Sequence, residues 1–296
     1  MQRVSASGNG GGSRVRVAVR VRPPEYRIPK DESRPACVSS SAHAVNAVEF
    51  QHEAHTKMFT FDHVFGSGAT QEDVYAGALQ PLMAQFLDGY NVTVMAYGQT
   101  GSGKTYTMGR KAPVLNTTPT TSPSRDRSSS LPMPTIQVDA HEYRGAPEDG
   151  LMPRFLFDLF TNLKREPSLR TIKVTFVEIY CDTIRDLLDD REKSLTIRED
   201  THNVWVENAR SLQVESLPKA LELLNLGRSR QTIGANALND QSSRSHAVYT
   251  MEVTRTFQSE IKRSKLTFVD LAGSERLKKT QVDGVRRRES IQINGS

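Results

Sequence analysis

Residues 98–105 read Gly98-Gln99-Thr100-Gly101-Ser102-Gly103-Lys104-Thr105, which matches the phosphate-loop pattern G-x-x-x-x-G-K-[ST]. Glycines let successive backbone N–H groups turn inward around an anion, because no Cβ obstructs them. The Lys104 ammonium group can reach the β- and γ-phosphates of a nucleotide, and the Thr105 hydroxyl can ligate Mg²⁺. The alternative interpretation is a glycine turn that only joins a strand to a helix. We favour a site for a nucleoside triphosphate.

The sequence on both sides of this loop has the expected pattern. Residues 91–97 form an apolar run that predicts a buried strand, and residues 105–108 can open a helix. A helix at this point would add the partial positive charge of its N-terminus to the anion site. The order of strand, glycine loop and helix therefore supports the nucleotide interpretation.

Composition restricts the class of protein. The chain has 296 residues, of which 36% are hydrophobic and 25% charged, which suits one large soluble α/β domain. No apolar run approaches the ~20 residues needed to cross a bilayer, and the first 13 residues lack the apolar stretch of a secretory signal. Cys37 and Cys181 show no metal-ligand spacing and are too few for a disulfide framework, which predicts a reducing compartment.

Positive charge is concentrated near the C-terminal end of the sequence. The stretch from Lys262 to Arg288 contains nine basic and three acidic residues, within a chain whose formal net charge is +5. Such a stretch favours an acidic partner, either a polynucleotide or an acidic protein surface, although a solvated face explains it equally well on charge alone. No RNA- or DNA-binding motif accompanies it, so a nucleic-acid-binding protein is the weaker interpretation.

Alternating strands and helices predict an α/β fold, a three-layer sandwich with a central, mostly parallel or mixed sheet. Thr70 and Asp73 form a capping box before a helix that runs to about Asp88 and is kinked by Pro81. The other predicted elements are strands at 14–21, 59–61, 172–180, 246–257 and 266–270, a helical turn at 184–188, a hairpin at 195–197 and 204–206, and a helix at 217–230.

Two segments lack the composition of a packed core. Residues 112–134 include five prolines and nine Ser or Thr residues, and no aromatic residue. They cannot bury enough apolar surface to offset the entropy of ordering, which predicts a disordered, low-complexity insertion at about 110–149. The Gly/Ser-rich residues 1–13 predict a disordered N-terminal extension.

Two further motifs provide groups that phosphate hydrolysis needs. The apolar strand at 266–270 ends in Asp270, which can hold Mg²⁺ through its water shell; Gly273 can offer its N–H to a γ-phosphate, and Glu275 follows two residues later. Residues 239–246 read Asn-Asp-Gln-Ser-Ser-Arg-Ser-His, in which small hydroxyls flank Arg244. Alone, this second stretch could also be a turn between a helix and a strand.

Together the three motifs resemble those of the kinesin motor superfamily, in which N-x-x-S-S-R-S-H and D-L-A-G-S-E are the two switch motifs. The resemblance covers residues 14–296. It implies an ATPase that binds ATP and Mg²⁺ and moves along microtubules (tubulin) in the cytoplasmic cytoskeleton. A guanine-binding N-K-x-D motif is absent, which argues against a GTPase.

The resemblance also implies roles for individual residues. Glu275 would accept the proton of the attacking water and pair with Arg244 when the switches close, so that Glu275→Ala should bind ATP without hydrolysing it. The implied catalytic residues are Glu275, Arg244, Ser243 and Gly273. The implied Mg²⁺ ligands are Thr105, Ser243 and Asp270. The implied nucleotide contacts are Arg20, Arg22 and Pro23 on the adenine side, Tyr75 stacked on the base, the whole loop 98–105, and Asn239, Ser242 and Ser243.

The sequence departs from the family pattern at its end. Residues 289–294 match the family, but the sequence then reads Gly295-Ser296, so that most of the microtubule-facing helix and the neck linker are expected to be missing, as is the oligomerisation region. Two functions remain open. The first is an ATP-driven microtubule motor whose motor domain is incomplete at its C-terminal end. The alternative is a truncated, non-motile nucleotide-binding module with a regulatory or partner-binding role.

Overall fold

The computed structural model describes residues 15–23, 37–42, 44–52, 55–109, 146–165, 169–191, 195–201, 204–237, 244–257 and 260–275. The predicted N-terminal extension, residues 110–145 of the predicted insertion and the basic residues after Glu275 lie outside these ranges. The chain divides into two compact units, Met1–Ala69 and Thr70–Ser296.

The first unit contains two small sheets. β1 (Ala18–Arg20) pairs in parallel with β5 (His63–Phe65), while β2 (Val38–Ser40), β3 (Ala47–His52) and β4 (His55–Thr60) form an antiparallel sheet. The strand predicted at residues 14–21 is therefore shorter, because only Ala18–Arg20 lies in register with a partner strand. The strand predicted at residues 59–61 begins earlier, as part of β4.

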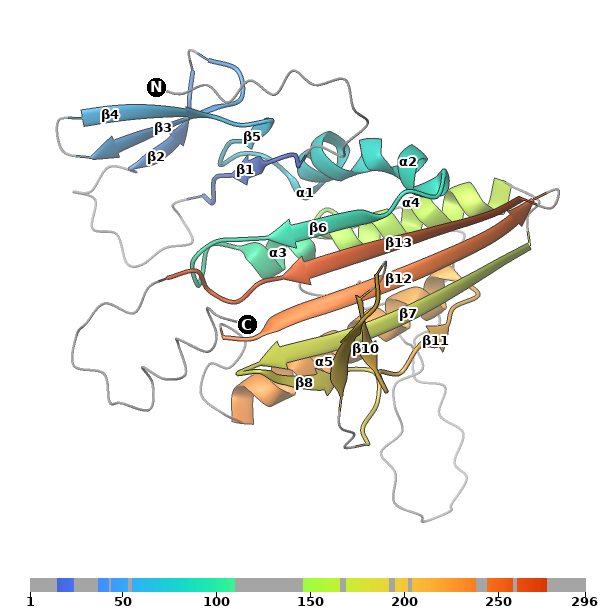
Figure 1. The fold of residues 1–296 in the computed structure, drawn as a ribbon. Helices are drawn as coiled ribbons and strands as arrows, with labels where there is room; N and C mark the ends of the chain where they lie inside the picture. The colour runs from blue at the N-terminus through green and yellow to red at the C-terminus, as the bar shows by residue number, and fades with distance from the viewer. Residues whose placement is uncertain are drawn as a thin grey trace, which may run out of the picture. The chain divides into compact units, whose positions relative to one another are not determined.

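The second unit is built on a mixed sheet with the strand order β11-β7-β12-β13-β6, and β8 adds to β7. Figure 1 shows these strands stacked from β6 to β7. Their bounds are β6 Val92–Ala96, β7 Leu169–Tyr180, β8 Thr183–Asp186, β11 Leu212–Gln213, β12 His246–Phe257 and β13 Glu260–Asp270. The predicted mixed sheet is confirmed. Among the described strands of this sheet only β6 and β13 run parallel, so antiparallel pairs dominate.

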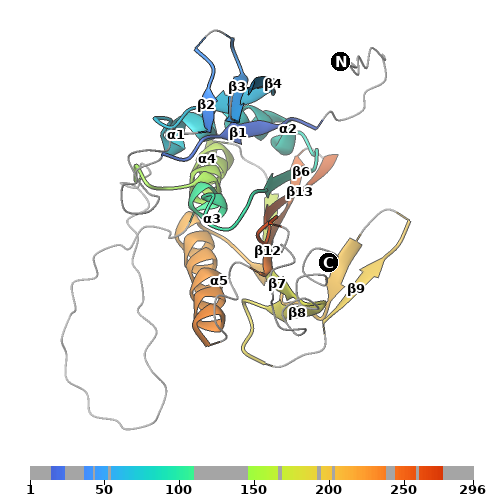
Figure 2. The ribbon, with the colours of Figure 1, turned by 90° about the vertical axis from the view of Figure 1, so that its left-hand side faces the viewer.

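Helices cover one face of this sheet. α3 (Lys104–Met108), α4 (Leu151–Arg165) and α5 (Leu217–Ala237) lie on the same side of it in Figure 2. α4 turns a stripe of apolar side chains inward at the spacing of an amphipathic helix, namely Met152, Phe155, Leu156, Leu159, Phe160 and Leu163. Phe155 packs edge-on against Phe86 and against Phe268 of β13, with ring centroids 5.5 and 6.1 Å apart. These aromatic contacts bind the helical layer to the sheet.

The predicted capping box is confirmed. The Thr70 hydroxyl accepts a hydrogen bond from the Asp73 N–H, and the Asp73 carboxylate accepts one from the Thr70 N–H. The helical segment that follows is interrupted near Pro81, as predicted, because proline cannot donate to the helical ladder. It is divided into α1 (Gln71–Val74), a π-helical turn η2 (Tyr75–Leu79), a 3₁₀ turn η3 (Gln80–Leu82) and α2 (Met83–Leu87).

The helical turn predicted at residues 184–188 is wrong. These residues begin in β8, which folds back on β7 through a two-residue turn at Cys181 and Asp182. Both turn residues have positive φ, 46° and 61°, as a type I′ hairpin turn requires. The predicted hairpin is confirmed as β9 (Thr196–Glu199) and β10 (Val204–Glu207), and the predicted helix at 217–230 continues to Ala237 in α5. None of the described helices is both long and apolar enough to traverse a membrane.

α5 approaches the sheet closely at Gly227. A Cβ at this position would overlap the ring of Phe176 on β7, which is almost completely buried. The missing side chain therefore determines how near the helix backbone lies to the strand.

We predict that Gly227→Ala destabilises the protein. Alanine favours a helix interior by ~1 kcal/mol over glycine, but overpacking a filled core costs about 1–3 kcal/mol. Urea denaturation should show a net loss of stability, whereas Ser229→Ala on the exposed side of the same helix should be nearly neutral. A stabilised Gly227→Ala variant would contradict the close packing of α5 on β7.

Candidate functional site

The phosphate-loop motif connects β6 to α3. Gly98, Gly101 and Gly103 all have positive φ, at 152°, 76° and 100°. A Cβ on Gly98 would lie 2.7 Å from the Ser102 hydroxyl oxygen, so glycine is needed there for space as well as for conformation. The Lys104 ammonium group folds back over the loop and donates to the carbonyl oxygens of Gly98 at 2.8 Å and Gln99 at 3.2 Å.

Parallel pairing brings the second motif to the same end of the sheet. Ala96, the last residue of β6, lies in register with Asp270, the last residue of β13. The loop and the carboxylate therefore leave the sheet side by side, and the Thr105 hydroxyl donates to Asp270 Oδ2 at 2.7 Å. The sequence alone predicted a role for each residue but not this contact between them.

The chemistry of this pair fits a divalent cation. The other carboxylate oxygen, Asp270 Oδ1, is buried and accepts no hydrogen bond from the described residues. A buried carboxylate oxygen without a donor is costly unless another group binds it. A hydroxyl and a carboxylate beside a phosphate loop are ligands that suit Mg²⁺. Thr105 and Asp270 are therefore the described residues that would hold the metal.

Glu275 contacts the phosphate loop at Thr100. Its carboxylate accepts a hydrogen bond from the Thr100 N–H at 2.8 Å and another from the Thr100 hydroxyl. Gly273 permits this approach, because a Cβ there would collide with both the Glu275 carboxylate and the Thr100 hydroxyl. The Ser274 N–H also donates to the Gly98 carbonyl at 3.1 Å. Three of the residues predicted for catalysis or phosphate contact (Gly273, Glu275 and Thr100) thus lie together.

The charges of the site shift two pKa values. Burial disfavours the charged form of Lys104 and lowers its pKa, although the carboxylates of Asp270 and Glu275 act in the opposite direction. Burial alone would raise the pKa of Glu275, but the hydrogen bonds from Thr100 and the charge of Lys104 outweigh it and hold that pKa below its usual value. Glu275 therefore stays ionised beside the loop at neutral pH.

A buried arginine completes the surroundings of Asp270. Arg228 of α5 places Nη1 3.4 Å from Asp270 Oδ2, and the two side chains are only 7% and 6% exposed. The same Nη1 donates to Gln231 Oε1 at 3.0 Å, while the guanidinium carbon lies 5.8 Å from the ring centroid of Phe176. Burial lowers the pKa of Arg228 and the charge of Asp270 opposes this shift. Sequence analysis did not identify Arg228, because a single arginine in a helix belongs to no motif.

The described part of the serine-rich motif contacts the D-L-A-G-S-E motif directly. The Ala272 N–H donates to His246 Nδ1 at 3.1 Å, and the Ser245 hydroxyl donates to the buried Glu178 carboxylate at 2.7 Å. Arg244 precedes this pair, and its closure onto Glu275 stays a prediction. Asn239, Ser242 and Ser243 lie outside the described residues, so their predicted roles also remain predictions.

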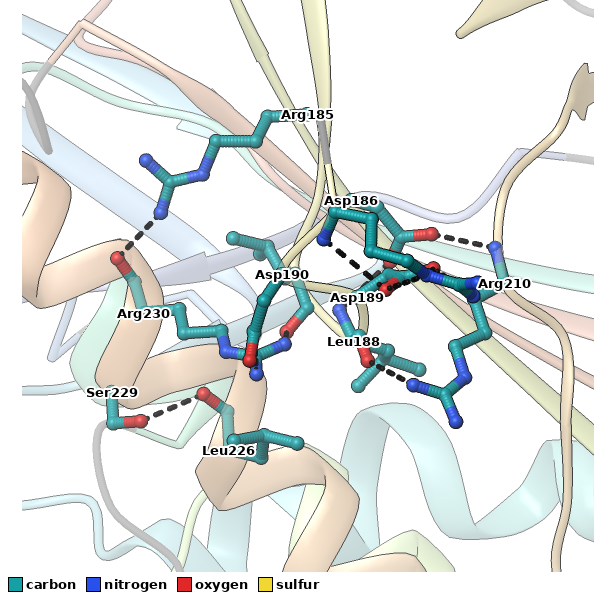
Figure 3. Close-up of polar contacts among 11 residues, drawn as sticks. Arg185, Asp186, Leu188, Asp189, Asp190, Arg210, Leu226, Ser229 and Arg230 are labelled. Atoms are coloured by element: carbon teal, nitrogen blue, oxygen red, sulfur yellow. Dashed lines mark hydrogen bonds and ion pairs between the residues drawn. The ribbon is translucent and has the colours of Figure 1, made fainter. Parts of the chain in front are cut away.

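The part of α5 that leads toward the serine-rich motif is held by β8 and the segment after it. Arg185 donates to the Arg230 carbonyl at 2.8 Å, Arg230 donates to the Leu187 carbonyl at 3.1 Å, and Arg230 forms an ion pair with Asp190 (Figure 3). Arg185 also lies 4.0 Å from Glu178, the acceptor of Ser245. Arg185 therefore contacts both Arg230, which precedes the serine-rich motif, and Glu178, which binds Ser245 within that motif.

Tyr75 packs against α4. Its side chain is buried, and its hydroxyl donates to Asp158 Oδ2 of α4 at 2.6 Å. Burial, with the Asp158 contact, strongly raises its pKa. Its predicted stacking on a base stays a prediction. Two exposed aromatic residues flank the loop, Tyr97 before it and Tyr106 of α3 after it, which are 78% and 48% exposed.

The remaining predicted contacts fall on the first unit. Arg20, Arg22 and Pro23 lie in or just after β1, and the Arg20 guanidinium donates to the Ala69 carbonyl at 3.2 Å. Their predicted contact with the adenine side of a nucleotide stays a prediction. Sequence analysis also missed Gln71, which is buried and donates from Nε2 to the Tyr106 carbonyl at 2.7 Å. Only its place in the capping-box helix could have suggested a link to α3.

Comparison with known proteins agrees with this geometry. The family model for the kinesin motor domain matches residues 20–296. The chain is 35% identical to chromosome-associated kinesin KIF4 of Xenopus laevis over 97% of its length, and 38% identical to kinesin-like protein kif7 of Danio rerio over 95%. It spans 22% and 19% of these two curated relatives, respectively.

A solved structure of a fast kinesin, described in connection with its ATPase mechanism and microtubule interactions, matches with a TM-score of 0.76 and 28% identity. The match covers 95% of this chain and 71% of that one. Fold and phosphate loop together therefore define an α/β P-loop nucleotide-binding protein of kinesin type. The chain belongs to the kinesin motor domain family.

We predict that Tyr75→Phe separates packing from nucleotide contact. Loss of the hydrogen bond to Asp158 should cost about 1 kcal/mol of stability in a denaturation experiment. Nucleotide affinity, measured by fluorescence of a labelled nucleotide, should equal that of the unchanged protein. Unchanged stability in Tyr75→Phe would contradict a contribution of the Asp158 hydrogen bond to packing.

Proposed function

We propose that this chain binds and hydrolyses Mg-ATP and couples the hydrolysis to microtubule binding and microtubule-based movement in the cytoplasmic cytoskeleton. The observation that carries the proposal is the convergence of the phosphate loop, the Thr105–Asp270 pair and Glu275 at one end of the sheet. Membership of the kinesin motor domain family supplies the coupling partner, tubulin.

The loop amides and Lys104 bind the β- and γ-phosphates in this proposal. Lys104 already lies over the loop, so it exchanges two backbone carbonyls for phosphate oxygens. Thr105 and Asp270, with Ser243, would hold Mg²⁺, which would supply positive charge to neutralise the charge that develops on the phosphates. Gly273 offers its N–H to the γ-phosphate, because it has no side chain to keep a phosphate away.

Glu275 performs the proton transfer. As an ionised carboxylate it can accept the proton of the attacking water, directly or through a second water. To do so it must leave the Thr100 amide, and Arg244 is the proposed partner in the closed state. An ion pair that forms only when the switches close stabilises that state specifically, because water is then excluded.

The test is ATP turnover by the purified chain with and without microtubules, together with co-sedimentation. Strong stimulation by microtubules and nucleotide-dependent co-sedimentation are expected. Nucleotide binding without stimulation would support the alternative, a non-motile nucleotide-binding module. Failure to bind nucleotide at all would exclude both functions.

We predict that Glu275→Ala binds ATP normally and hydrolyses it at least about 100-fold more slowly, since a positioned base contributes this much or more. Binding is measured with a fluorescent ATP analogue and hydrolysis by phosphate release. Glu222→Ala, on the exposed side of α5 and paired only with Lys219 among the described contacts, is the matched control and should turn over normally. Normal turnover by Glu275→Ala would remove this residue from the mechanism.

A further inference from the structure

Asp270 already has a cationic partner within the protein fold. Its Oδ2 atom accepts from the Thr105 hydroxyl and lies 3.4 Å from Arg228 Nη1, while Oδ1 is buried without a donor among the described residues. The carboxylate is thus bound on one side only. A further cation would gain most electrostatic energy at Oδ1, the oxygen that has no donor among the described residues.

Arg228 is fixed in this position by its surroundings. Its guanidinium lies against Phe176, donates to Gln231 and lies 3.3 Å from the Met152 sulfur. Gly227, the preceding residue, allows α5 to lie close enough to the sheet for this arrangement. A long side chain held on several sides cannot leave Asp270 without losing all of these contacts.

The energetics of a buried pair decide what Arg228 does. Removing one member of such a pair leaves the other charge uncompensated in a poorly solvated place. A divalent cation that binds Asp270 meets repulsion from the guanidinium, because both carry positive charge and lie next to the same carboxylate. The guanidinium therefore stabilises the metal-free protein and opposes the metal.

We propose that Arg228 is the resident counter-cation of Asp270 and sets the Mg²⁺ concentration at which the phosphate site fills. Arg228 is a positioning residue in this role, because it acts through Asp270 and touches neither phosphate nor water. The proposal rests on the proposed function in so far as the metal enters together with a nucleotide.

The test measures nucleotide binding as a function of free Mg²⁺. A fluorescent nucleoside diphosphate is bound to the full chain while EDTA buffers free Mg²⁺, and the midpoint of binding is recorded. Arg228→Met removes the charge and keeps much of the volume, and its midpoint should fall by about tenfold because the competing cation is gone. Arg228→Lys keeps the charge, and its midpoint should stay within about threefold of the unchanged protein.

Two controls separate this role from a structural one. Arg198→Met removes an exposed arginine that pairs with Glu207 on the β9–β10 hairpin, and its midpoint should not move. In an Asp270→Asn background, Arg228→Met should also leave the midpoint unchanged, because the two residues act through one interaction. A structural role would lower stability in Arg228→Met without moving the midpoint.

The melting temperature gives a second readout without nucleotide. Arg228→Met should melt lower than the unchanged protein in EDTA and gain more stability from added Mg²⁺, since the metal then compensates Asp270. If Arg228→Met folds only in Mg²⁺, that dependence supports the proposal, and failure to fold even with Mg²⁺ overturns it. An unchanged or raised midpoint in folded Arg228→Met also overturns it. If the unchanged protein shows no Mg²⁺-dependent binding, the proposed function itself fails.

Discussion

The hydrogen bond between Thr105 and Asp270 joins the two halves of the candidate site, and it depends on the parallel pairing of β6 and β13. Parallel neighbours end at the same edge of a sheet, so whatever follows each strand is placed together. Here a glycine loop follows one strand and a carboxylate ends the other. If the register of β13 slipped by one residue, the Asp270 side chain would point to the opposite face of the sheet. The pairing of the two backbones therefore determines that the glycine loop and the carboxylate lie side by side.

Those parts of the site that consist of consecutive residues could be predicted from the sequence. The loop 98–105, the strand that ends at Asp270 and the Thr70 capping box could be read directly, because backbone geometry and side-chain chemistry coincide within a few residues. Residues 184–188 could not, since their apolar spacing suits a short helix and only the turn at Cys181 and Asp182 returns the chain onto β7. This pairing is local, but the turn lacks the Asn-Gly or Asp-Gly signal that marks a two-residue hairpin in a sequence.

The contacts of Tyr75 and Arg228 were beyond prediction for a different reason. Each depends on a partner that is far away in sequence, Asp158 for the tyrosine and Asp270 for the arginine. The family resemblance of residues 71–75 predicts that Tyr75 stacks on the base, and it says nothing of the hydrogen bond to α4. An arginine within a leucine-rich helix looks like an exposed charge until the fold buries it. Long-range polar partners decide both cases.

The closeness of α5 to β7 at Gly227 has a consequence for how this protein can vary. The gap between the helical layer and the sheet is set at a position that carries no side chain. Any residue larger than glycine would lift the helix and draw the neighbouring guanidinium away from the carboxylate it neutralises. The addition of one methyl group at Gly227, outside the phosphate loop, would thus alter the ion pair between Arg228 and Asp270. The packing distance between the two layers therefore also sets the position of a buried charge.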